Sequence, residues 1–313
     1  MIAPRSAGLV SFIMPVWRPR GEWLLAAVRS VLEQRDCRLE LIVVDDGCPE
    51  PVAPLLAGIE DDRMRLVRAE HGGAAGARNA GLAVARGDLV RFVDYDDVCE
   101  PDSTALLVRV MGGDDHVISY GATLLCDDAL RPTWTMVSSL QGTITHDCLL
   151  GRFHVRLPSL LFPRRVTDAV GAWDPSFRLS ADWDYVLRAL DHARVRGERD
   201  VVTYYRRHAA SLMGTATIAE GEDEWRRIMT CYFDRHPEQR GTELERQAEA
   251  ELYLDRGIAY ASDRRYGESL DRFRRAAALD PWATAKAAAR FVPRHGVWLA
   301  RRYLGALRHR RRP

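Results

Sequence analysis

The chain has 313 residues, a formal net charge of +1 and an apolar fraction of 47%. This length allows one large domain or two modest ones, and the apolar fraction is typical of a globular protein. The near-zero net charge excludes a global field that attracts nucleic acid, so we expect no nucleic-acid partner. The six cysteines form no C-x-x-C pair, which argues against a zinc knuckle.

Targeting signals are not evident in the sequence. The apolar stretch Leu9–Trp17 is short and has no cleavage site after it, and no apolar run approaches the roughly 18 residues of a membrane span. We therefore expect a cytoplasmic protein with reduced thiols.

Apolar strands and amphipathic helices alternate along the first part of the chain. The pattern predicts strands at Leu9–Val16, Leu39–Val44, Met64–Val67 and Leu89–Val93, helices at Trp23–Gln34, Pro54–Ile59 and Ala77–Ala85, and a glycine-rich turn at His71–Gly76. This alternation predicts an α/β fold with a mostly parallel sheet and helices on both faces. Ligands of such sheets bind outside the carboxyl ends of the strands.

Carboxylates gather at two of these strand ends. Asp45 and Asp46 follow the second strand, and Asp94, Asp96 and Asp97 follow the fourth. Two charges about 5 Å apart repel by roughly 3 kcal/mol at an effective dielectric of about 20. If the segment stays extended, the first and second carboxylates of D-x-D share one face. Mn²⁺ or Mg²⁺, shared with substrate phosphates, would offset the repulsion; simple capping of a turn or helix is the alternative.

Four segments in this order resemble the inverting family 2 glycosyltransferases, which have the Rossmann-like GT-A fold. They are VSFIMPVW (10–17), LELIVVDDG (39–47), GARNAGLAVARGDLVRFVDYDD (76–97) and SADWDYVLRAL (180–190). The resemblance covers about the first two-thirds of the chain. It implies metal-dependent, inverting transfer of a sugar from a nucleoside diphosphate sugar, UDP or TDP by the family's habits, to an acceptor hydroxyl of a glycan, a lipid-linked saccharide or a natural product.

The resemblance also implies roles for individual residues. Nucleotide contacts are implied for Pro15, Val16, Trp17, Asp45, Asp46 (on the base), Arg78, Asn79, Asp94, Tyr95 and Asp96, and metal contacts for Asp96, Asp97 and His208. His208 could contact either the metal or the diphosphate, because imidazole serves both; a structural role is the alternative.

The catalytic base of this resemblance is Asp182, with Asp184 supporting the site. The family's Glu before the base is Ala181 here, and its Asn after the first aromatic residue is Arg18. The missing Glu leaves the choice between Asp182 and Asp184 open. The alternative for Asp182 is a charge that stabilises the N-terminus of a helix.

The composition turns helical and charged after about residue 211. We expect a catalytic domain at 1–215 and a helical region at 216–313, with one tetratricopeptide-like hairpin at about 250–283. Its characteristic residues lie within GIAYASDRRYGESLDRFRRAAALDP (257–281). A lone repeat cannot bury its faces, so it should pack on neighbouring helices or on a second chain, giving a homodimer or a site that recruits the acceptor.

The end of the chain is strongly basic. From Arg290 to Arg312 there are eight arginines and no acidic residue, with apolar residues interleaved. Such a tail could lie peripherally on the inner face of the membrane; a frayed final helix is the alternative.

Functions of other classes also fit parts of the sequence. One is a glycosyltransferase whose peptide or protein acceptor is recruited by the helical region, and another is a non-catalytic protein that binds nucleotide sugars or partners. DYDDV also fits the nucleophile motif of haloacid-dehalogenase-type phosphatases, but that motif belongs on the first strand of its fold. The sequence leaves open the sugar, the nucleotide, the acceptor and the oligomeric state.

Overall fold

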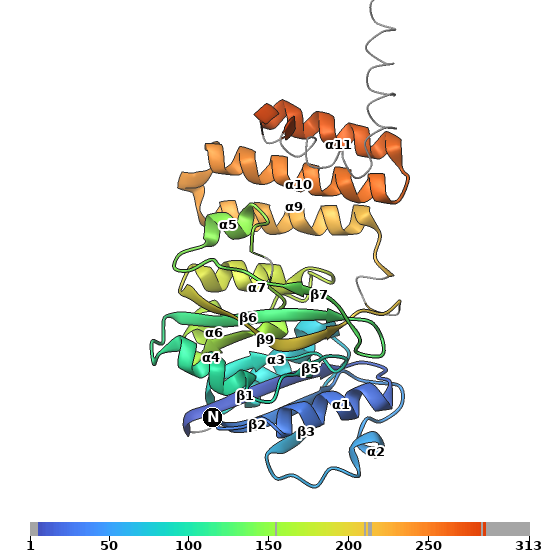
Figure 1. Cartoon of the computed structure of the whole chain (residues 1–313), viewed down its shortest axis with the longest axis vertical. Helices are drawn as coiled ribbons and strands as arrows, with labels where there is room; N and C mark the ends of the chain where they lie inside the picture. Colours follow the sequence, from blue (N-terminus) through green and yellow to red (C-terminus); the bar gives the residue numbers. More distant parts are fainter. Residues whose placement is uncertain (1–5, 154, 210, 212–214, 283, 286–313) are drawn as a thin grey trace, which may run out of the picture. The chain divides into compact units, whose positions relative to one another are not determined.

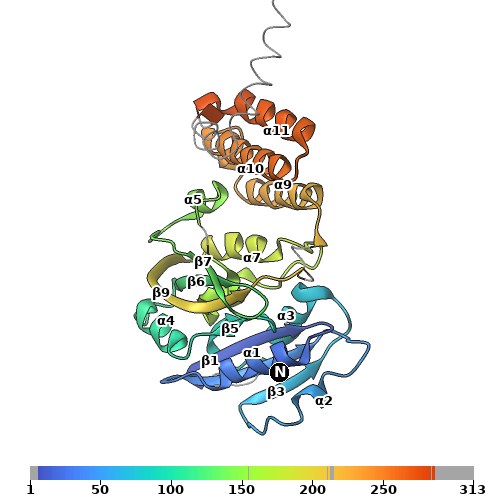
Figure 2. The same cartoon turned by 45° about the vertical axis from the view of Figure 1, so that its right-hand side comes forward.

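A computed structural model of the chain describes residues 6–153, 155–209, 211, 215–282 and 284–285. The chain divides into two compact units, one of residues 1–148 with 152–216 and the other of residues 149–151 with 217–313. Figures 1 and 2 colour these units along the sequence. The basic tail lies outside the described residues.

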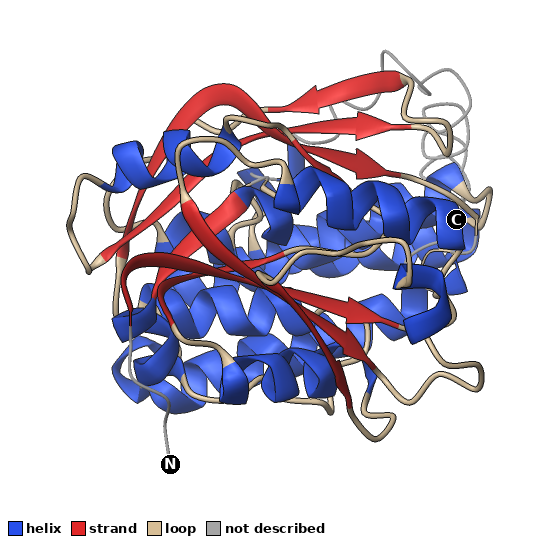
Figure 3. Cartoon of the chain, turned by 90° about the horizontal axis from the view of Figure 1, so that it is seen from below, coloured by secondary structure: helices blue, strands red, loops and turns tan. Residues whose placement is uncertain are grey.

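The first unit is built on a mixed sheet of nine strands among the described residues, in the order β3-β2-β1-β4-β8-β6-β9-β5, with β7 paired to β6. Figure 3 colours the strands red and the helices blue. The strands are β1 (Ser6–Val16), β2 (Arg38–Asp45), β3 (Met64–Arg68), β4 (Gly87–Phe92), β5 (Val98–Cys99), β6 (Val117–Cys126), β7 (Pro132–Met136), β8 (Leu160–Pro163) and β9 (Arg194–Arg206). Strands β3, β2, β1 and β4 are parallel, whereas β8 is antiparallel to β4 and β6. The predicted α/β class is confirmed. Apart from the parallel pair β6–β9, the parallel strands all lie on one side of the sheet.

Helices cover both faces of the parallel strands. The helices of this unit are α1 (Gly21–Leu32), α2 (Ala53–Leu56), α3 (Gly73–Val84), α4 (Ser103–Met111), α5 (Thr145–Leu149), α6 (Arg164–Val170) and α7 (Ala181–Leu190), with the 3-10 turn η1 (Leu157–Ser159). Alternation along β1 sends Phe12 into the core cluster that contains Leu24 and Val28 of α1. Ile13 points the other way, against Gly81 of α3, where a Cβ atom would lie 2.4 Å from its methyl group. Gly81 therefore allows α3 to approach the sheet closely.

The first strand ends at Val16, as predicted, with Pro15 paired with Val44 in the parallel ladder. Two other local predictions need correction. The predicted turn at His71–Gly76 is too long, since α3 already begins at Gly73. The segment after β4 is a turn and not extended chain, because the Asp97 amide donates to the Asp94 carbonyl at 3.2 Å.

The second unit is helical, as predicted. It contains α9 (Ile218–Arg235), η2 (Pro237–Gln239), α10 (Glu243–Ser262) and α11 (Tyr266–Leu279), which Figures 1 and 2 show as neighbours. The Ser269 hydroxyl of α11 donates to the Gly257 carbonyl of α10 at 2.8 Å. Arg272 of α11 forms an ion pair with buried Glu222 of α9 at 2.9 Å. The tetratricopeptide type of this hairpin stays a prediction.

Within the part of the chain that the structure describes, every helix is too short or too polar to cross a membrane.

Candidate active site

The acidic turn after β4 carries three carboxylates, and each has a partner in the protein. Arg78 of α3 donates to the Asp94 carboxylate at 2.8 Å, and His208 Nε2 lies 2.9 Å from the Asp96 carboxylate. The Asp97 carboxylate accepts from the backbone amide of Arg206, the last residue of β9, at 2.9 Å. The repulsion that the sequence predicts is therefore offset in part by the chain itself. The turn also sends the three side chains to different partners, which an extended segment would not do.

His208 is held in place by its surroundings. Its side chain is only 6% exposed, and its ring packs against Trp23 of α1 with the ring centroids 4.6 Å apart. The guanidinium of Arg206 lies over the same indole and donates through Nε to the Asp96 carbonyl at 2.8 Å. Residues from α1, the acidic turn and the end of β9 thus form one packed group.

Two polar atoms in this group have no hydrogen-bond partner within the described residues. They are Oδ2 of Asp97 and Nδ1 of His208, and both are buried. Burial, Asp96 and Asp94 raise the pKa of Asp97 well above its usual value, against the effect of Arg206. Burial and Asp94 likewise raise the pKa of Asp96, against the effect of His208. These groups would gain from a positively charged ligand.

The residues fit a divalent cation that is shared with a ligand. Among the described residues, no three His, Cys, Asp or Glu side chains are arranged as a complete metal site. Asp96 and His208 supply a carboxylate and an imidazole side by side, and Asp97 adds a carboxylate oxygen without a partner. Mg²⁺ usually binds through one or two carboxylates together with substrate phosphates, so an incomplete protein site is compatible with it.

Arg78 connects the acidic turn to α7. Its guanidinium lies 4.8 Å from the centre of the Trp173 ring, and that ring stacks on Tyr185 of α7 at 4.0 Å. The neighbouring Asn79 uses both ends of its amide on Trp173, accepting from its backbone N–H at 2.7 Å and donating to its carbonyl at 2.9 Å. These bonds fix Asn79 against the Trp173 loop, and its nucleotide contact stays a prediction.

The ends of β1 and β2 form a second polar group. The Asp46 carboxylate is buried; it accepts from the Gly72 amide at 2.8 Å and lies 2.8 Å from Nδ1 of His71. The His71 ring stacks on Trp17 at 3.9 Å. The sequence did not point to His71; its place in the predicted glycine-rich turn was the only signal.

Asp45 is held by partners within the same group, and its predicted nucleotide contact stays a prediction. Its carboxylate accepts from the Cys48 amide at 2.8 Å and pairs with Arg68 of β3 at 2.8 Å. Gly47 between these residues has a φ of +68°, and a Cβ atom there would lie 2.9 Å from the His71 amide nitrogen. The Asp-Asp-Gly turn is thus shaped by backbone geometry and close packing.

The two aspartates of α7 lie in different surroundings. The Asp184 side chain is 5% exposed and pairs with Arg188 at 2.7 Å, and Arg188 also donates to the carbonyls of Val170 and Ala172. Within the described part of the chain, the Asp182 carboxylate accepts only from the amide of the next residue, Trp183, at 2.9 Å. This contact agrees in part with the helix-terminus alternative, but it leaves the other carboxylate oxygen available.

Asp182 lies within reach of the charges of the acidic turn. Burial, and to a smaller extent Asp94, raise the pKa of its carboxyl. Arg78, Arg156 and the Trp183 amide lower that pKa, but the net effect is a rise. The charges of Arg78, Arg156 and Asp94 therefore all act on the Asp182 carboxyl.

Arg156 is a residue of this site that the sequence reasoning missed. Its guanidinium lies over the Tyr205 ring at 5.1 Å and acts on both Asp182 and Tyr205. Its buried Nε has no hydrogen-bond partner within the described residues. A lone arginine in an irregular segment has no sequence signature, so only the fold reveals its position.

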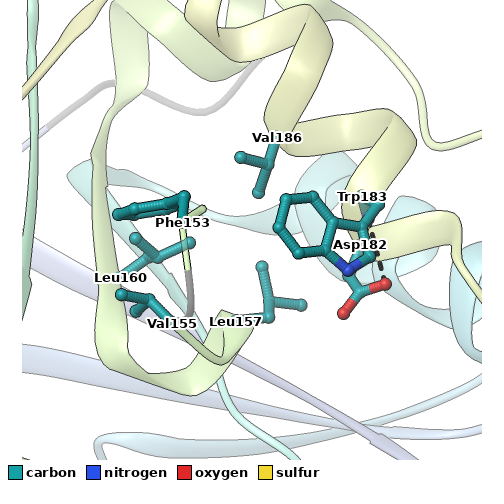
Figure 4. A pocket seen from close by; sticks show the side chains of 7 residues that line it. All are labelled: Phe153, Val155, Leu157, Leu160, Asp182, Trp183 and Val186. Carbon is teal, nitrogen blue, oxygen red and sulfur yellow. Dashed lines mark hydrogen bonds between the residues drawn. The ribbon is translucent and has the colours of Figure 1, made fainter. Parts of the chain in front are cut away.

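A small pocket opens beside Asp182. Figure 4 shows its wall of mostly apolar side chains from α7 and from the segment before β8. The lining residues are Phe153, Val155, Leu157, Leu160, Asp182, Trp183 and Val186.

Comparison with known proteins agrees with this geometry. Residues 11–165 match the model of glycosyl transferase family 2. An uncharacterized glycosyltransferase of Nostoc sp. is 27% identical over 215 residues, which are 64% of this chain and 66% of that protein. Succinoglycan biosynthesis protein ExoO of Rhizobium meliloti is 35% identical over 101 residues, 32% of this chain and 29% of that protein.

The match to other relatives is partial. An uncharacterized protein of Sinorhizobium fredii is 29% identical over 201 residues, which cover 60% of this chain and only 21% of that protein.

Among solved structures, S. aureus TarS 1–349 in complex with UDP-GlcNAc matches with a TM-score of 0.57 at 14% identity, over 86% of this chain and 90% of that one. At this identity the match shows the fold alone. The family match shows that residues 11–165 form a glycosyl transferase family 2 domain, and the TarS match shows that its fold is GT-A.

Proposed function

We propose that the first unit transfers a sugar from a nucleoside diphosphate sugar, UDP or TDP, to an acceptor hydroxyl with inversion at the anomeric carbon. The family match supports glycosyl transfer, and the TarS structures with UDP-GlcNAc and with UDP support a uridine nucleotide. Inversion requires a base on the acceptor side and stabilisation of the leaving group on the other side.

The observation that supports the proposal most strongly is that the carboxylates of the site differ in their hydrogen-bond partners. Among the described residues, Asp94, Asp96 and Asp184 each have a cationic or imidazole partner, whereas Asp182 and Asp97 each accept from a backbone amide. We assign Asp97 to the cation, which leaves Asp182. A base must have a free oxygen to receive a proton, so we assign this role to Asp182 and a supporting role to Asp184 through Arg188. Burial raises the pKa of Asp182, and a pKa nearer to the working pH makes a carboxylate a better base.

The donor would lie over the carboxyl ends of β1, β2 and β4. We assign the base of the nucleotide to the edge formed by Trp17 and by Asp46 with its partner His71. Arg78 and Arg156 supply positive charge where the diphosphate leaves. The remaining nucleotide contacts in the proposal are those of Pro15, Val16, Asp94, Tyr95 and Asp96. Burial raises the pKa of Tyr95 to about 12, so its hydroxyl remains a hydrogen-bond donor.

Mn²⁺ or Mg²⁺ completes the proposal. Asp96, Asp97 and His208 would hold the cation, which when bound would neutralise charge on the diphosphate. The acceptor is a glycan, a lipid-linked saccharide or a natural product. We propose in addition that the second unit recruits a peptide acceptor or forms a homodimer. A further proposal is that the basic tail contacts the inner face of the membrane.

A thermal-shift panel tests the proposal. Wild-type protein is heated with UDP, TDP, GDP or ADP, each with Mn²⁺ or with EDTA. A nucleotide at about one hundred times its Kd stabilises the fold by about 2.7 kcal/mol. For a unit of this size that equals a Tm rise of roughly 5–10 °C. We expect this rise for UDP or TDP with Mn²⁺ and a much smaller one with EDTA.

Two variants make the panel specific. Asp96→Asn should remove most of the Mn²⁺-dependent shift, while Asp62→Asn, the same change at an exposed carboxylate, should keep it. A Tm that no nucleotide changes would refute the donor assignment. A UDP-dependent shift without any release of UDP from UDP-sugars would favour the non-catalytic binding protein instead.

A further inference from the structure

An arginine that the site description has not yet used lies beside the packed group of the acidic turn. Arg20 is the residue before α1, and its guanidinium carbon lies 4.3 Å from the centre of the Trp23 ring. The same indole contacts the His208 ring at 4.6 Å and the Arg206 guanidinium at 4.8 Å. Trp23 is 5% exposed, whereas Arg20 is exposed. The Arg20 side chain therefore packs on a buried indole and keeps its charge in contact with solvent.

The two guanidinium groups on this indole differ in their partners. Arg206 donates to the backbone carbonyls of Asp96 and Asp128. Within the described part of the chain, no carboxylate, carbonyl or hydroxyl accepts a hydrogen bond from the Arg20 side chain. A guanidinium has five N–H donors in its plane, and stacking on an aromatic ring leaves them available. Arg20 is thus a cation held in place by an aromatic ring, with its donors open to an anion.

The position of Arg20 relates it to the residues that we assign to the cation. Its guanidinium carbon and the His208 ring lie 4.3 and 4.6 Å from the indole, so they are at most about 9 Å apart. His208 in turn lies 2.9 Å from the Asp96 carboxylate. Two linked phosphates extend over several ångströms. A diphosphate with one phosphate near His208 and Asp96 can therefore place the other within hydrogen-bond reach of Arg20.

We propose that Arg20 binds the diphosphate of the nucleotide sugar and that Trp23 positions it for this contact. The inference rests on the proposed function and deepens it by naming a further residue that recognises the diphosphate class of donor. Contacts between guanidinium and phosphate are charge-assisted and are frequently bidentate. Arg20 would add to the positive charge that Arg78 and Arg156 supply where the diphosphate leaves.

Binding of UDP and uridine tests the inference without a known acceptor. Calorimetry with Mn²⁺ measures the Kd for UDP, and an NMR titration measures the Kd for uridine, which lacks both phosphates. Arg20→Met keeps a long apolar side chain and removes the charge. In this variant we expect UDP to bind at least tenfold more weakly and uridine to bind within about threefold of the wild type. Tenfold corresponds to about 1.4 kcal/mol, the lower end for a hydrogen bond to a charged group.

Two further variants separate the charge of Arg20 from its packing on Trp23. Arg20→Lys restores the positive charge and should recover part of the lost affinity for UDP. Arg29→Met is the same change at another exposed position of α1 and should leave both Kd values unchanged. An equal loss of UDP affinity in Arg20→Lys and Arg20→Met, or an equal loss for UDP and uridine in Arg20→Met, would indicate packing alone and overturns the inference.

The affinity of the wild-type protein separates this inference from the proposed function. If the wild type binds UDP and Arg20→Met binds it equally well, only the role of Arg20 fails and the donor site stands. If the thermal-shift panel selects TDP, then TDP and thymidine replace UDP and uridine. If the wild type binds neither diphosphate, the donor site of the proposed function fails and the inference fails with it.

Discussion

Replacement of Asn79 distinguishes a positioning residue from a nucleotide contact. In the structure its amide makes two hydrogen bonds to the backbone of Trp173, at 2.7 and 2.9 Å. Asn79→Ala would leave both backbone groups without this partner. A lost hydrogen bond that leaves a buried group unsatisfied costs about 1–3 kcal/mol, and the half-buried position suggests the lower end for each. We therefore expect a loss of about 2 kcal/mol, or a Tm lower by roughly 4–8 °C.

The assay compares stability with nucleotide affinity in the same variant. Thermal unfolding without ligand gives the loss of stability, and calorimetric titration at a temperature where the variant is folded gives the Kd for UDP. A positioning role predicts the lower Tm with a Kd changed by less than about threefold. A direct nucleotide contact predicts an unchanged Tm with a Kd about tenfold weaker. That result would refute our interpretation of Asn79.

Four further predictions concern the charged groups. Asp184→Asn breaks a buried ion pair and should cost about 3 kcal/mol, seen as a Tm lower by roughly 6–12 °C, whereas an unchanged Tm would contradict the pairing with Arg188. Asp182→Asn should raise Tm slightly. Burial raises the folded-state pKa of Asp182 above its unfolded value, so the charge of Asp182 opposes folding at a pH above the unfolded pKa. This cost is relieved as the pH falls through the folded pKa. For the same reason kcat/KM should fall in acid with a midpoint above the usual 3.8, which a pH–rate profile measures. Arg156→Gln should lower kcat/KM at least tenfold with Tm within about 2 °C, Arg156→Lys should restore part of the rate, and full activity of the Gln variant would exclude a role in the reaction.

The strand ends of the site were predictable because they follow continuous apolar runs. The core strands β1, β2 and β4 place Val16, Asp45 and Phe92 near their carboxyl ends, and a parallel sheet brings these ends to one edge. Local pattern is sufficient here, because apolar periodicity determines both the element and its direction.

The partners of the acidic residues come from distant segments, and the sequence indicated only some of them. His208 contacts Asp96 across 112 positions of sequence, and the family resemblance had already grouped it with Asp96 and Asp97. Arg206 contacts Asp97 across 109 positions, and no pattern in the sequence indicates that contact.

The charge balance of the site changes the reasoning about the cation. The sequence suggests that a cation is needed because the carboxylates would otherwise repel one another. The structure supplies Arg78 and His208 as partners, so the remaining demand for positive charge is concentrated at Asp97 and its unpaired oxygen.

The assignment of Asp182 as the base is the central claim, and one measurement tests it most directly. UDP release from a UDP-sugar is followed with saturating acceptor in the wild-type protein and in Asp182→Asn, while calorimetry measures the Kd for UDP in both. The account predicts a loss of at least 10²-fold in kcat, in line with general-base catalysis, with a Kd for UDP within about threefold of the wild type. A variant that retains wild-type kcat would contradict it.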